Sequence, residues 1–385
     1  MTRLQDIEVK GKYVVVRLDL NVPLSGGNIV SDFRIRAALP TITYLQEHGA
    51  KQIVLLSHLG RPVGRPKSNP DMIRAGNPTL SLAPVAKRLR DLLGTATETL
   101  TERVIEDFPL PVFILTRGLY LAENLRFDWR EEENDPIFAA EIAALGDCFV
   151  FDAFSVAHRA HASTAGVMQH TTAAVAGLRL QEEVATLEQL STTVAHPFVA
   201  VLGGAKMKTK LPVLQRLIGQ VDQILLGGVM ANTFAKALDV DVRQSVIEPD
   251  EVTRAGTLAK EYPDKVVLPQ DYTWNGDKIV DIGPTTRQAF TETIGSAKTV
   301  FWNGTLGLTS TPSQEFKYGS LDIARAMMDN RSALTIVSGG DTVGLLEAEG
   351  LDLSKLSFVS TGGGATLKFL AGESLPALVA LGYTG

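Results

Sequence analysis

Residues 197–220 read PFVAVLGGAKMKTKLPVLQRLIGQ. An apolar run, FVAVL, is followed by two glycines and then by a stretch with the composition and spacing of a helix. Such a run predicts a buried strand, and the glycines predict a tight turn into the helix. A strand, a turn and a helix in this order are the building block of a parallel sheet that helices cover on both faces.

The same order recurs along the whole chain. In the second half, further apolar runs are QILLGG, KVVLPQ, KTVFWNG, LTIVSGG and LSFVSTGGG. In the first half, they are YVVVRLDL, KQIVLLS, PVFILT and CFVFDAF. Helix-like stretches lie between them, so the sequence predicts an α/β fold with two doubly wound, Rossmann-like domains built on parallel sheets.

A helix is expected to join the two domains. Residues 179–196, RLQEEVATLEQLSTTVAH, place apolar side chains at spacings of three and four, at Leu180, Val184, Leu187 and Leu190. This spacing puts them on one face of a helix. We therefore predict domains at 1–178 and 197–371, with a C-terminal segment at 372–385.

Composition restricts the class of protein. Of 385 residues, 45% are hydrophobic and 21% are charged, which excludes global disorder. The net charge of −6 argues against a general binder of nucleic acid or of anionic membranes. Cys148 is the only cysteine, so no intrachain disulfide forms and a cytoplasmic protein is expected. The chain has neither a signal-peptide core at its start nor an apolar run near the roughly 18 residues that span a bilayer.

Glycines mark the strand ends of the second half. Backbone N–H groups in such turns can approach a phosphate, although strand-to-helix turns also need glycine for geometry alone. Several at one sheet edge favour ligand binding over geometry. The turns contain Gly203-Gly204, Gly227-Gly228, Gly339-Gly340 and Gly362-Gly363-Gly364.

Charged residues accompany two of these turns. Lys206 and Lys210 are four apart on the first turns of the predicted helix, so they share a face and repel unless an anion lies between them. A solvated basic face is the alternative interpretation. SGGDT (338–342) adds Asp341, a possible Mg²⁺ ligand, and Thr342, although both residue types are also good helix caps.

The strand ends of the first half carry cations instead. Residues 152–164, DAFSVAHRAHAST, are the densest example, and the arginine between the histidines makes a zinc site improbable there. Burying several cations together is costly unless anions compensate, which a small, multiply charged substrate would do. The set is Arg17, Arg34, His58, Arg61, Arg126, His158, Arg159 and His161.

Familiar nucleotide-binding loops are absent. The chain contains no GxxxxGK[ST] loop, no GxGxxG turn after a strand, and no HRD or DFG motif. P-loop enzymes, nicotinamide dehydrogenases and protein kinases are therefore excluded.

With these segments in view, the chain resembles the phosphoglycerate kinase family along nearly its whole length. Eleven segments match in order: RLDLNVP, RIRAALPTI, SHLGRP, LAENLRF, FVFDAFSVAHRAHAST, LGGAKMKTKL, LLGGVMANTF, DIGP, FWNG, SGGDT and STGGGATL. The resemblance implies two α/β domains that face each other across a cleft. The N-terminal domain would bind phosphoglycerate and the C-terminal domain magnesium nucleotide, with residues 372–385 returning to the N-terminal domain.

The implied activity is reversible phosphoryl transfer between 1,3-bisphosphoglycerate and ADP, giving 3-phosphoglycerate and ATP, a reaction of glycolysis and gluconeogenesis. The resemblance implies Mg²⁺ as cofactor, small-molecule substrates, no nucleic-acid or membrane partner, and a monomer. The implied substrate-binding residues are Asp19, Leu20, Asn21, Arg34, His58, Leu59, Gly60, Arg61, Arg126 and Arg159.

The resemblance also assigns the nucleotide side. Arg34, Lys206 and Gly363 would act on the phosphoryl group in flight, and Asp341 would hold Mg²⁺. The implied nucleotide-binding residues are Gly203, Lys206, Lys210, Gly227, Gly228, Asn303, Gly339, Gly340, Asp341, Thr342, Gly362, Gly363 and Gly364.

The chain departs from the family pattern around the nucleotide base and ribose. Thr305 replaces a proline, Thr309 and Ser310 stand where Phe and Glu are expected, and Val229 replaces a glycine. Glu315 is a candidate replacement for the ribose-binding Glu. No phosphoryl-transfer residue is lost, so we expect intact chemistry with an unusual nucleotide affinity or preference.

Two other functions remain open. One is a divergent paralogue that acts on another carboxylate or acyl phosphate, against which His58, Arg61, Arg126 and Arg159 argue. The other is a catalytically silent binding homologue, against which the retained residues Arg34, Lys206, Lys210 and Asp341 argue.

Overall fold

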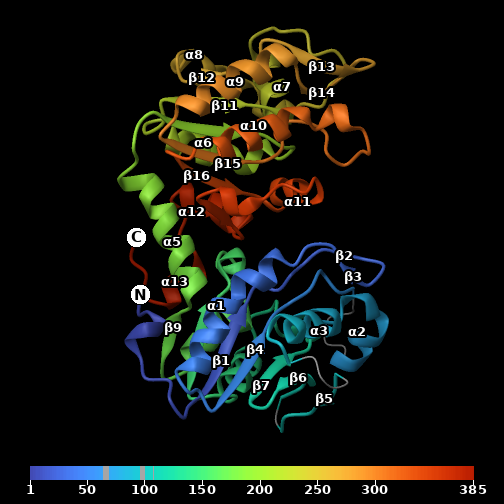
Figure 1. Ribbon diagram of the computed structural model, residues 1–385, viewed down its shortest axis with the longest axis vertical. Helices are drawn as coiled ribbons and strands as arrows, with labels where there is room; N and C mark the ends of the chain where they lie inside the picture. The colour runs from blue at the N-terminus through green and yellow to red at the C-terminus, as the bar shows by residue number, and fades with distance from the viewer. Residues whose placement is uncertain (64–68, 96–99, 107) are drawn as a thin grey trace. The chain divides into compact units, whose positions relative to one another are not determined.

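The computed structural model describes residues 1–63, 69–95, 100–106 and 108–385. The chain forms two compact units (Figure 1). Unit 1 comprises Met1–Ala185 and Ser374–Gly385, and unit 2 comprises Thr186–Glu373. The division falls inside helix α5 (Leu178–Thr192), so one continuous helix belongs to both units.

Helix α5 buries the apolar face that its sequence predicts. Leu180, Leu187 and Leu190 are fully buried and Val184 is 2% exposed. The polar residues between them are partly or fully exposed, with the exception of Glu183. The spacing of apolar residues therefore identified this helix, although it ends at Thr192 and not at residue 196 as predicted.

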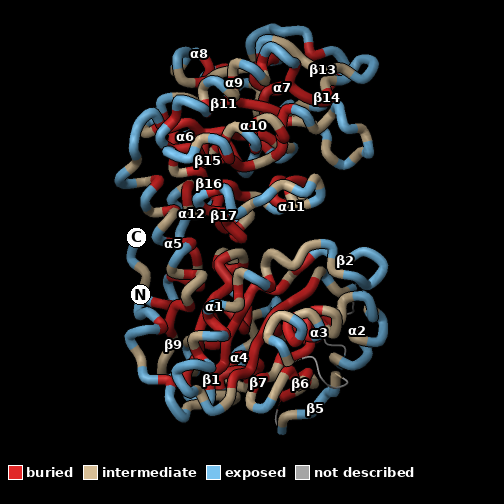
Figure 2. The backbone as a smooth tube through the Cα atoms, in the orientation of Figure 1, coloured by how far each residue is buried: buried red, intermediate tan, exposed pale blue. Residues whose placement is uncertain are grey.

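Unit 1 is built on a seven-stranded sheet in the order β5-β6-β7-β4-β1-β8-β9. From β7 to β9 the neighbours are parallel, whereas β5 and β6 form an antiparallel edge. The strands are β1 (Tyr13–Leu18), β4 (Gln52–Leu56), β5 (Glu102–Arg103), β6 (Val112–Thr116), β7 (Leu119–Ala122), β8 (Cys148–Asp152) and β9 (Ala174–Ala176). The central strands β1, β4 and β8 are almost wholly buried. Figure 2 shows the buried tube that runs through the middle of this unit.

Strands β5, β7 and β9 of this sheet are absent from the sequence interpretation, and β7 changes the topology. The apolar run at 111–116 forms β6, but it pairs antiparallel with β7, which lies directly before the Arg126 segment. Only Arg117 and Gly118 separate the two strands, and Gly118 has a φ of 80°. A two-residue turn can join antiparallel strands only, so the run does not lead into a crossover helix.

Helices flank this sheet, and the end of the chain joins them. Ala377 in α13 donates its N–H to the Ala157 carbonyl at 3.1 Å, so residues 374–385 pack on the loop that follows β8. The helices of unit 1 are α1 (Phe33–Glu47), α2 (Pro70–Gly76), α3 (Ala83–Leu92), α4 (Pro136–Ala143) and α13 (Pro376–Ala380), with short turns including η3 (Leu125–Phe127), η4 (Phe154–Val156) and η5 (Ala162–Gly166).

Unit 2 is built on a six-stranded, wholly parallel sheet in the order β12-β11-β10-β15-β16-β17. Its strands are β10 (Phe198–Leu202), β11 (Gln223–Leu226), β12 (Val266–Val267), β15 (Thr299–Asn303), β16 (Leu334–Ser338) and β17 (Phe358–Ser360). Its helices are α6 (Met207–Leu217), α7 (Gly228–Ala237), α8 (Val252–Glu261), α9 (Pro284–Ser296), α10 (Tyr318–Asp329), α11 (Gly340–Ala348) and α12 (Gly364–Leu370). A separate hairpin of β13 (Tyr272–Asn275) and β14 (Lys278–Ile282) was not predicted.

The predicted class, α/β with two parallel-sheet domains, is confirmed. Within the described ranges, no helix combines the length and the apolar character that crossing a membrane requires.

Shortening a buried side chain of α5 tests the packing of this helix. We expect Leu187→Ala to lower the free energy of unfolding by about 2–4 kcal/mol, because it removes apolar contacts and leaves a cavity. Gln189→Ala, on the exposed side of the same turn, is the control and should change it by less than about 0.5 kcal/mol. Urea unfolding measures both, and equal midpoints for the two variants would contradict the burial.

Candidate functional site

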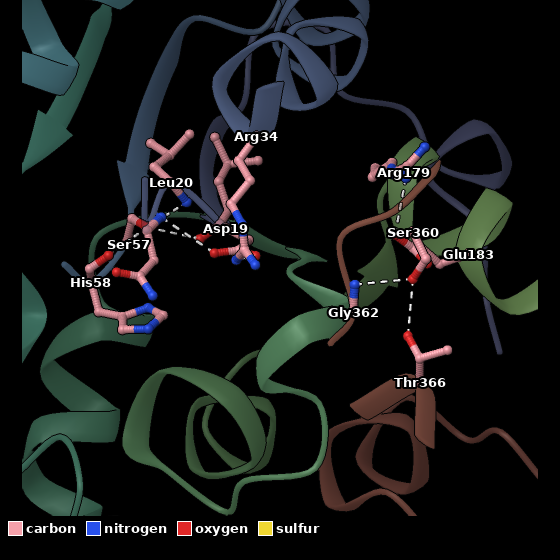
Figure 3. Close-up of polar contacts among 12 residues, drawn as sticks. Asp19, Leu20, Arg34, Ser57, His58, Arg179, Glu183, Ser360, Gly362 and Thr366 are labelled. Atoms are coloured by element: carbon pink, nitrogen blue, oxygen red, sulfur yellow. Dashed lines mark hydrogen bonds and ion pairs between the residues drawn. The ribbon is translucent and has the colours of Figure 1, made fainter. Parts of the chain in front are cut away.

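The strands of unit 1 bring the predicted cations to one edge. β7, β4, β1 and β8 are parallel neighbours, so their carboxyl ends lie side by side. The segments that leave them are 19–21, 57–61, 123–126 and 153–161, which contain nearly all of the predicted substrate residues. The remaining one, Arg34, is the second residue of α1 and forms an ion pair with Asp19 (Figure 3).

Hydrogen bonds lock these segments to one another. The Asn21 side-chain oxygen accepts from the Gly60 N–H at 2.9 Å. Ser57 Oγ accepts from the Leu20 N–H at 2.9 Å, as Figure 3 shows, and donates to the Leu18 carbonyl. The ends of β1 and β4 therefore form one rigid surface.

Two of the predicted substrate residues belong to the hydrophobic core. Leu20 is fully buried and Leu59 is 2% exposed. The Leu20 N–H donates to Ser57, and the Leu59 N–H donates to Asn124 at 3.1 Å. Their side chains and amides are thus engaged in packing the strand ends.

Arg126 places a buried positive charge at this edge. Its guanidinium donates to the Gly60 carbonyl at 2.6 Å and pairs with Glu132 at 3.1 Å. Burial lowers the pKa of Arg126, and the nearby charges of Arg159 and Arg61 act in the same direction. These positive charges lie close enough together to repel one another, and an anionic ligand would relieve the repulsion.

Partners beneath this surface were not found from the sequence. Arg17 was recognised only as a cation, and Glu131 and Ser163 were not singled out. All three are almost wholly buried. Burial lowers the pKa of Arg17 to about 10, against the opposing charges of Glu131 and Asp19. Only tertiary structure brings together residues so far apart in the chain.

In unit 2, three predicted nucleotide-binding glycines are required by backbone packing. A Cβ on Gly203 would collide with the Thr305 carbonyl, and one on Gly228 would lie 2.8 Å from the Gly204 nitrogen. A Cβ on Gly227 would collide with Leu306.

The amides of these glycines are also occupied. Gly203, Gly227 and Gly228 donate to the carbonyls of Asn303, Leu202 and Leu306 at 2.9–3.0 Å. They therefore offer no free N–H to a phosphate. The geometric interpretation of these turns, which the sequence left open, accounts for all three glycines.

The other glycine turns are open. A Cβ on Gly340, Gly363 or Gly364 would meet no atom within 4 Å, and Gly339 and Gly363 have φ values of 109° and 52°. The first amides of α11 have no acceptor inside the helix, and exposed Asp341 lies in this turn.

Internal hydrogen bonds fix both open turns. Thr342 is fully buried, and its Oγ1 accepts from the Gly304 N–H at 3.0 Å, so its hydroxyl serves the fold. Asn303, at the end of β15, is 3% exposed. In the other turn, Ser360 Oγ accepts from the Gly362 N–H at 3.1 Å and contacts Thr366 Oγ1 at 2.9 Å (Figure 3).

The two lysines differ from the expected pair. α6 begins at Met207, so Lys206 is the residue before the helix and is exposed, whereas Lys210 is 7% exposed. Burial lowers the pKa of Lys210, with Asp341 opposing and Lys206 adding to the effect. The prediction that both lie on the first turns of a helix was wrong for Lys206.

A carboxylate already covers the start of α6. Glu248 accepts from the N–H groups of Met207 at 2.8 Å and Lys208 at 3.1 Å, and its own N–H donates to Thr233. A helix N-terminus attracts negative charge, and here the chain supplies it. Glu248 is about 40 residues from α6 in the sequence, so no local pattern could have revealed it.

Asp281, in the quoted DIGP segment, anchors the loop that contains the departures from the family pattern. It is 1% exposed and accepts from the N–H groups of Gly319 at 2.7 Å and Ile282 at 2.8 Å. A Cβ on Gly307 would crowd its carboxylate. Burial raises the pKa of Asp281 to about 7 against these hydrogen bonds.

Asp341 fits Mg²⁺ only together with a bound nucleotide. Among the described residues, no group of three or more His, Cys, Asp or Glu side chains could hold a metal ion. Mg²⁺ typically binds one or two carboxylates with water and substrate phosphates. The single exposed carboxylate near Lys210 matches that donor set.

The fold defines a two-unit α/β protein whose strand edges carry the candidate sites. A family model described as phosphoglycerate kinase matches residues 4–373. The phosphoglycerate kinase of Chloroflexus aurantiacus is 44% identical and that of Dictyoglomus turgidum 41%, each over 98% of this chain and 97–98% of the relative.

Solved structures agree with these relatives. Phosphoglycerate kinase from Pyrococcus horikoshii has a TM-score of 0.82 at 29% identity, covering 100% of this chain and 99% of that one. The Coxiella burnetii enzyme has a TM-score of 0.79 at 35% identity, covering 99% and 98%. The chain belongs to the phosphoglycerate kinase family.

Alanine substitutions should separate the packed glycines from the open ones. We expect Gly203→Ala to lower the free energy of unfolding by about 2 kcal/mol or more, because its Cβ would collide with backbone. Gly340→Ala should change it by less than about 1 kcal/mol. Chemical unfolding measures both, and equal losses would refute the distinction.

Asp281 should make stability depend on pH. Its folded pKa of about 7 exceeds the 3.8 of an ordinary Asp, so the folded state holds the extra proton between these values. The contribution of this group to the free energy of unfolding is therefore full below about pH 4. It should fall by about 2–4 kcal/mol as pH rises to 7.

Asp281→Asn removes this titration, so the stability of the wild type relative to the variant should decline from pH 5 to about pH 8. Asp264→Asn, at an exposed position of the same unit, is the control and should show no such trend. A stability difference for Asp281→Asn that stays constant with pH would contradict the assignment.

Proposed function

We propose that this protein is a magnesium-dependent kinase that catalyses reversible phosphoryl transfer from 1,3-bisphosphoglycerate to ADP. In the reverse direction the acceptor is the carboxyl group of 3-phosphoglycerate. One observation supports an anionic substrate more strongly than any other. The side chains of Arg61, Arg159 and Lys206 form no hydrogen bond or ion pair with another described residue, although Arg126 and Lys210 add further charge beside them.

In unit 1, three arginines and a histidine would bind the substrate. His58, Arg61, Arg126 and Arg159 would hold its fixed phosphate and glycerate end. Asp19 would accept from a glycerate hydroxyl with one oxygen while the other holds Arg34, the residue assigned to the phosphoryl group. Because the ion pair between Asp19 and Arg34 joins these two tasks, binding and charge stabilisation depend on the same carboxylate.

In unit 2, Lys206 and Lys210 would bind nucleotide phosphates, and Asp341 would hold Mg²⁺, which would neutralise phosphate charge. The N–H groups of Gly340 and Gly363 lie in turns where an added Cβ would meet no atom within 4 Å, so they are candidates to bind phosphate. Phosphoryl transfer depends on positioning and on charge stabilisation. The attacking carboxylate is already ionised at neutral pH, so no general base is required.

The nucleotide affinity is the property in which this chain should differ from its relatives. Thr305 is 8% exposed and its carbonyl accepts a hydrogen bond from the Gly204 N–H, so the replacing residue takes part in the backbone hydrogen bonding of this turn. Val229 lies half-buried at the start of α7, and Glu315 lies exposed in the turn before α10. We propose that these changes alter base and ribose binding in an enzyme that is otherwise a monomer of the cytoplasm.

Turnover of 3-phosphoglycerate with MgATP, coupled to consumption of the acyl phosphate, tests the function. We expect activity in the wild type and a loss of about 10²–10³-fold in kcat for Lys206→Ala, because a cation is removed from the transferring group. Lys208→Ala is the matched control, since Lys208 is an exposed lysine two residues away. It should keep nearly all of the activity.

The alternatives predict other results. A silent binding homologue would bind 3-phosphoglycerate without turnover, and a divergent paralogue would turn over another carboxylate instead. Equal loss of activity in the two lysine variants would contradict the role of Lys206 and point to a general effect of charge.

A further inference from the structure

A buried chain of polar side chains runs beneath the cation cluster of unit 1. Ser163 Oγ donates to Glu131 Oε1 at 2.6 Å, and the Ser163 N–H donates to Glu131 Oε2 at 2.9 Å. Arg17 Nε donates to Ser163 Oγ at 2.9 Å. Arg17 also contacts the Leu18 carbonyl and, through Nη2, His58 Nδ1 at 3.1 Å. Glu131 and Arg17 are each 1% exposed and Ser163 is fully buried.

This chain determines which nitrogen of His58 carries a proton. A guanidinium has donors only, so in the contact with Arg17 the His58 Nδ1 atom must be the acceptor. An Nδ1 that accepts has no proton, and the imidazole is then neutral with its proton on Nε2. Hydrogen bonds from Nε to Ser163 and from Nη1 to the Leu18 carbonyl hold the guanidinium of Arg17 in this orientation.

We propose that Glu131, Ser163 and Arg17 are positioning residues that hold His58 as a neutral imidazole protonated at Nε2. His58 then serves the anion site as a hydrogen-bond donor and not as a cation. Glu131 is linked to His58 through Ser163 and Arg17 and lies 3.8 Å from His161 Nδ1, so it acts at a distance from the ligand.

The charges around His58 favour the same state. Arg17 from β1, Arg126 from η3, Arg34 from α1 and His161 all face it, and each is or can become positive. Burial, followed by these charges, lowers the pKa of His58 well below its ordinary value. A second positive charge beside Arg17 would be strongly disfavoured.

Glu131 supplies the compensating negative charge. Burial alone would raise the pKa of its carboxyl, but His161, Arg17 and Ser163 together hold the pKa below its usual value. An ionised Glu131 therefore faces the buried guanidinium through Ser163. Without that negative charge, Arg17 would be a buried cation with few partners, and its hydrogen bond to His58 would weaken.

The identity of the ligand of His58 rests on the proposed function, but the protonation state does not. It can be measured in the free protein with ¹⁵N-labelled histidine, by two-bond ¹H–¹⁵N correlation from about pH 5 to pH 8. His58→Gln assigns the signals by their loss. We expect the pattern of a neutral ring protonated at Nε2 throughout. An Nδ1-protonated ring, or an imidazolium at neutral pH, would overturn the proposal.

Removing the middle of the chain tests its role. In Ser163→Ala, Arg17 loses the acceptor for its Nε, so His58 should become a mixture of the two neutral tautomers. Ser245→Ala is the matched control, because Ser245 is also a buried serine with a hydrogen bond, to the Ile279 N–H at 2.8 Å in unit 2. It should leave the His58 spectrum unchanged. A folded Ser163→Ala with an unaltered spectrum would show that the chain does not control His58.

Binding of 3-phosphoglycerate tests whether His58 acts as a neutral hydrogen-bond donor or as a cation. His58→Gln keeps an N–H donor without a charge, so its Kd should stay within about threefold of wild type, whereas His58→Ala should weaken binding by about tenfold. Equal weakening in both variants would show that charge is needed. If the wild type does not bind this compound, the proposed function fails, while the spectrum still decides the protonation state.

Discussion

Neighbouring parallel strands end at the same edge of a sheet, so the segments that leave them must pack closely against one another. The structure of both units depends on how these segments are accommodated. Unit 2 resolves it with glycine, because Gly203 and Gly228 let the backbone at Thr305 approach without a Cβ in between. Unit 1 resolves it with side chains that bridge the strand ends, such as the bond from Gly60 to Asn21. The position of each candidate site follows from these contacts.

The two sheet edges also differ in the charged side chains that they present to a ligand. In unit 1 the deeper cation, Arg17, is balanced by Glu131 through Ser163, while the outer ones crowd one another. In unit 2 the amides that a phosphate could use at α6 are taken by Glu248, so an anion there must rely on lysine side chains. A ligand would meet arginine and histidine on one unit, but lysine, one carboxylate and open glycine turns on the other.

The sequence was sufficient for the elements that bury a continuous apolar face. β1, β8 and β10 follow from their apolar runs, and α5 follows from its spacing. It was also sufficient to gather Asp19, His58 and Arg126 at one edge, since parallel neighbours share it. The hairpin of β6 and β7 was missed because an apolar run does not show whether its strand pairs parallel or antiparallel with a neighbour. The tight turn at Gly118 makes this pairing antiparallel.

What the sequence could not give is the partner of each polar group. A glycine in the sequence shows that no Cβ is present but not what occupies the space, which is backbone at Gly203 and nothing within 4 Å at Gly363. An arginine likewise shows a charge but not its counterion: Arg34 forms an ion pair with Asp19, whereas the side chain of Arg159 forms none with any described residue. Groups already bonded within the fold maintain the geometry, and those left over are free for a ligand. Function at such an edge is therefore assigned by satisfied and unsatisfied partners, which long-range contacts decide.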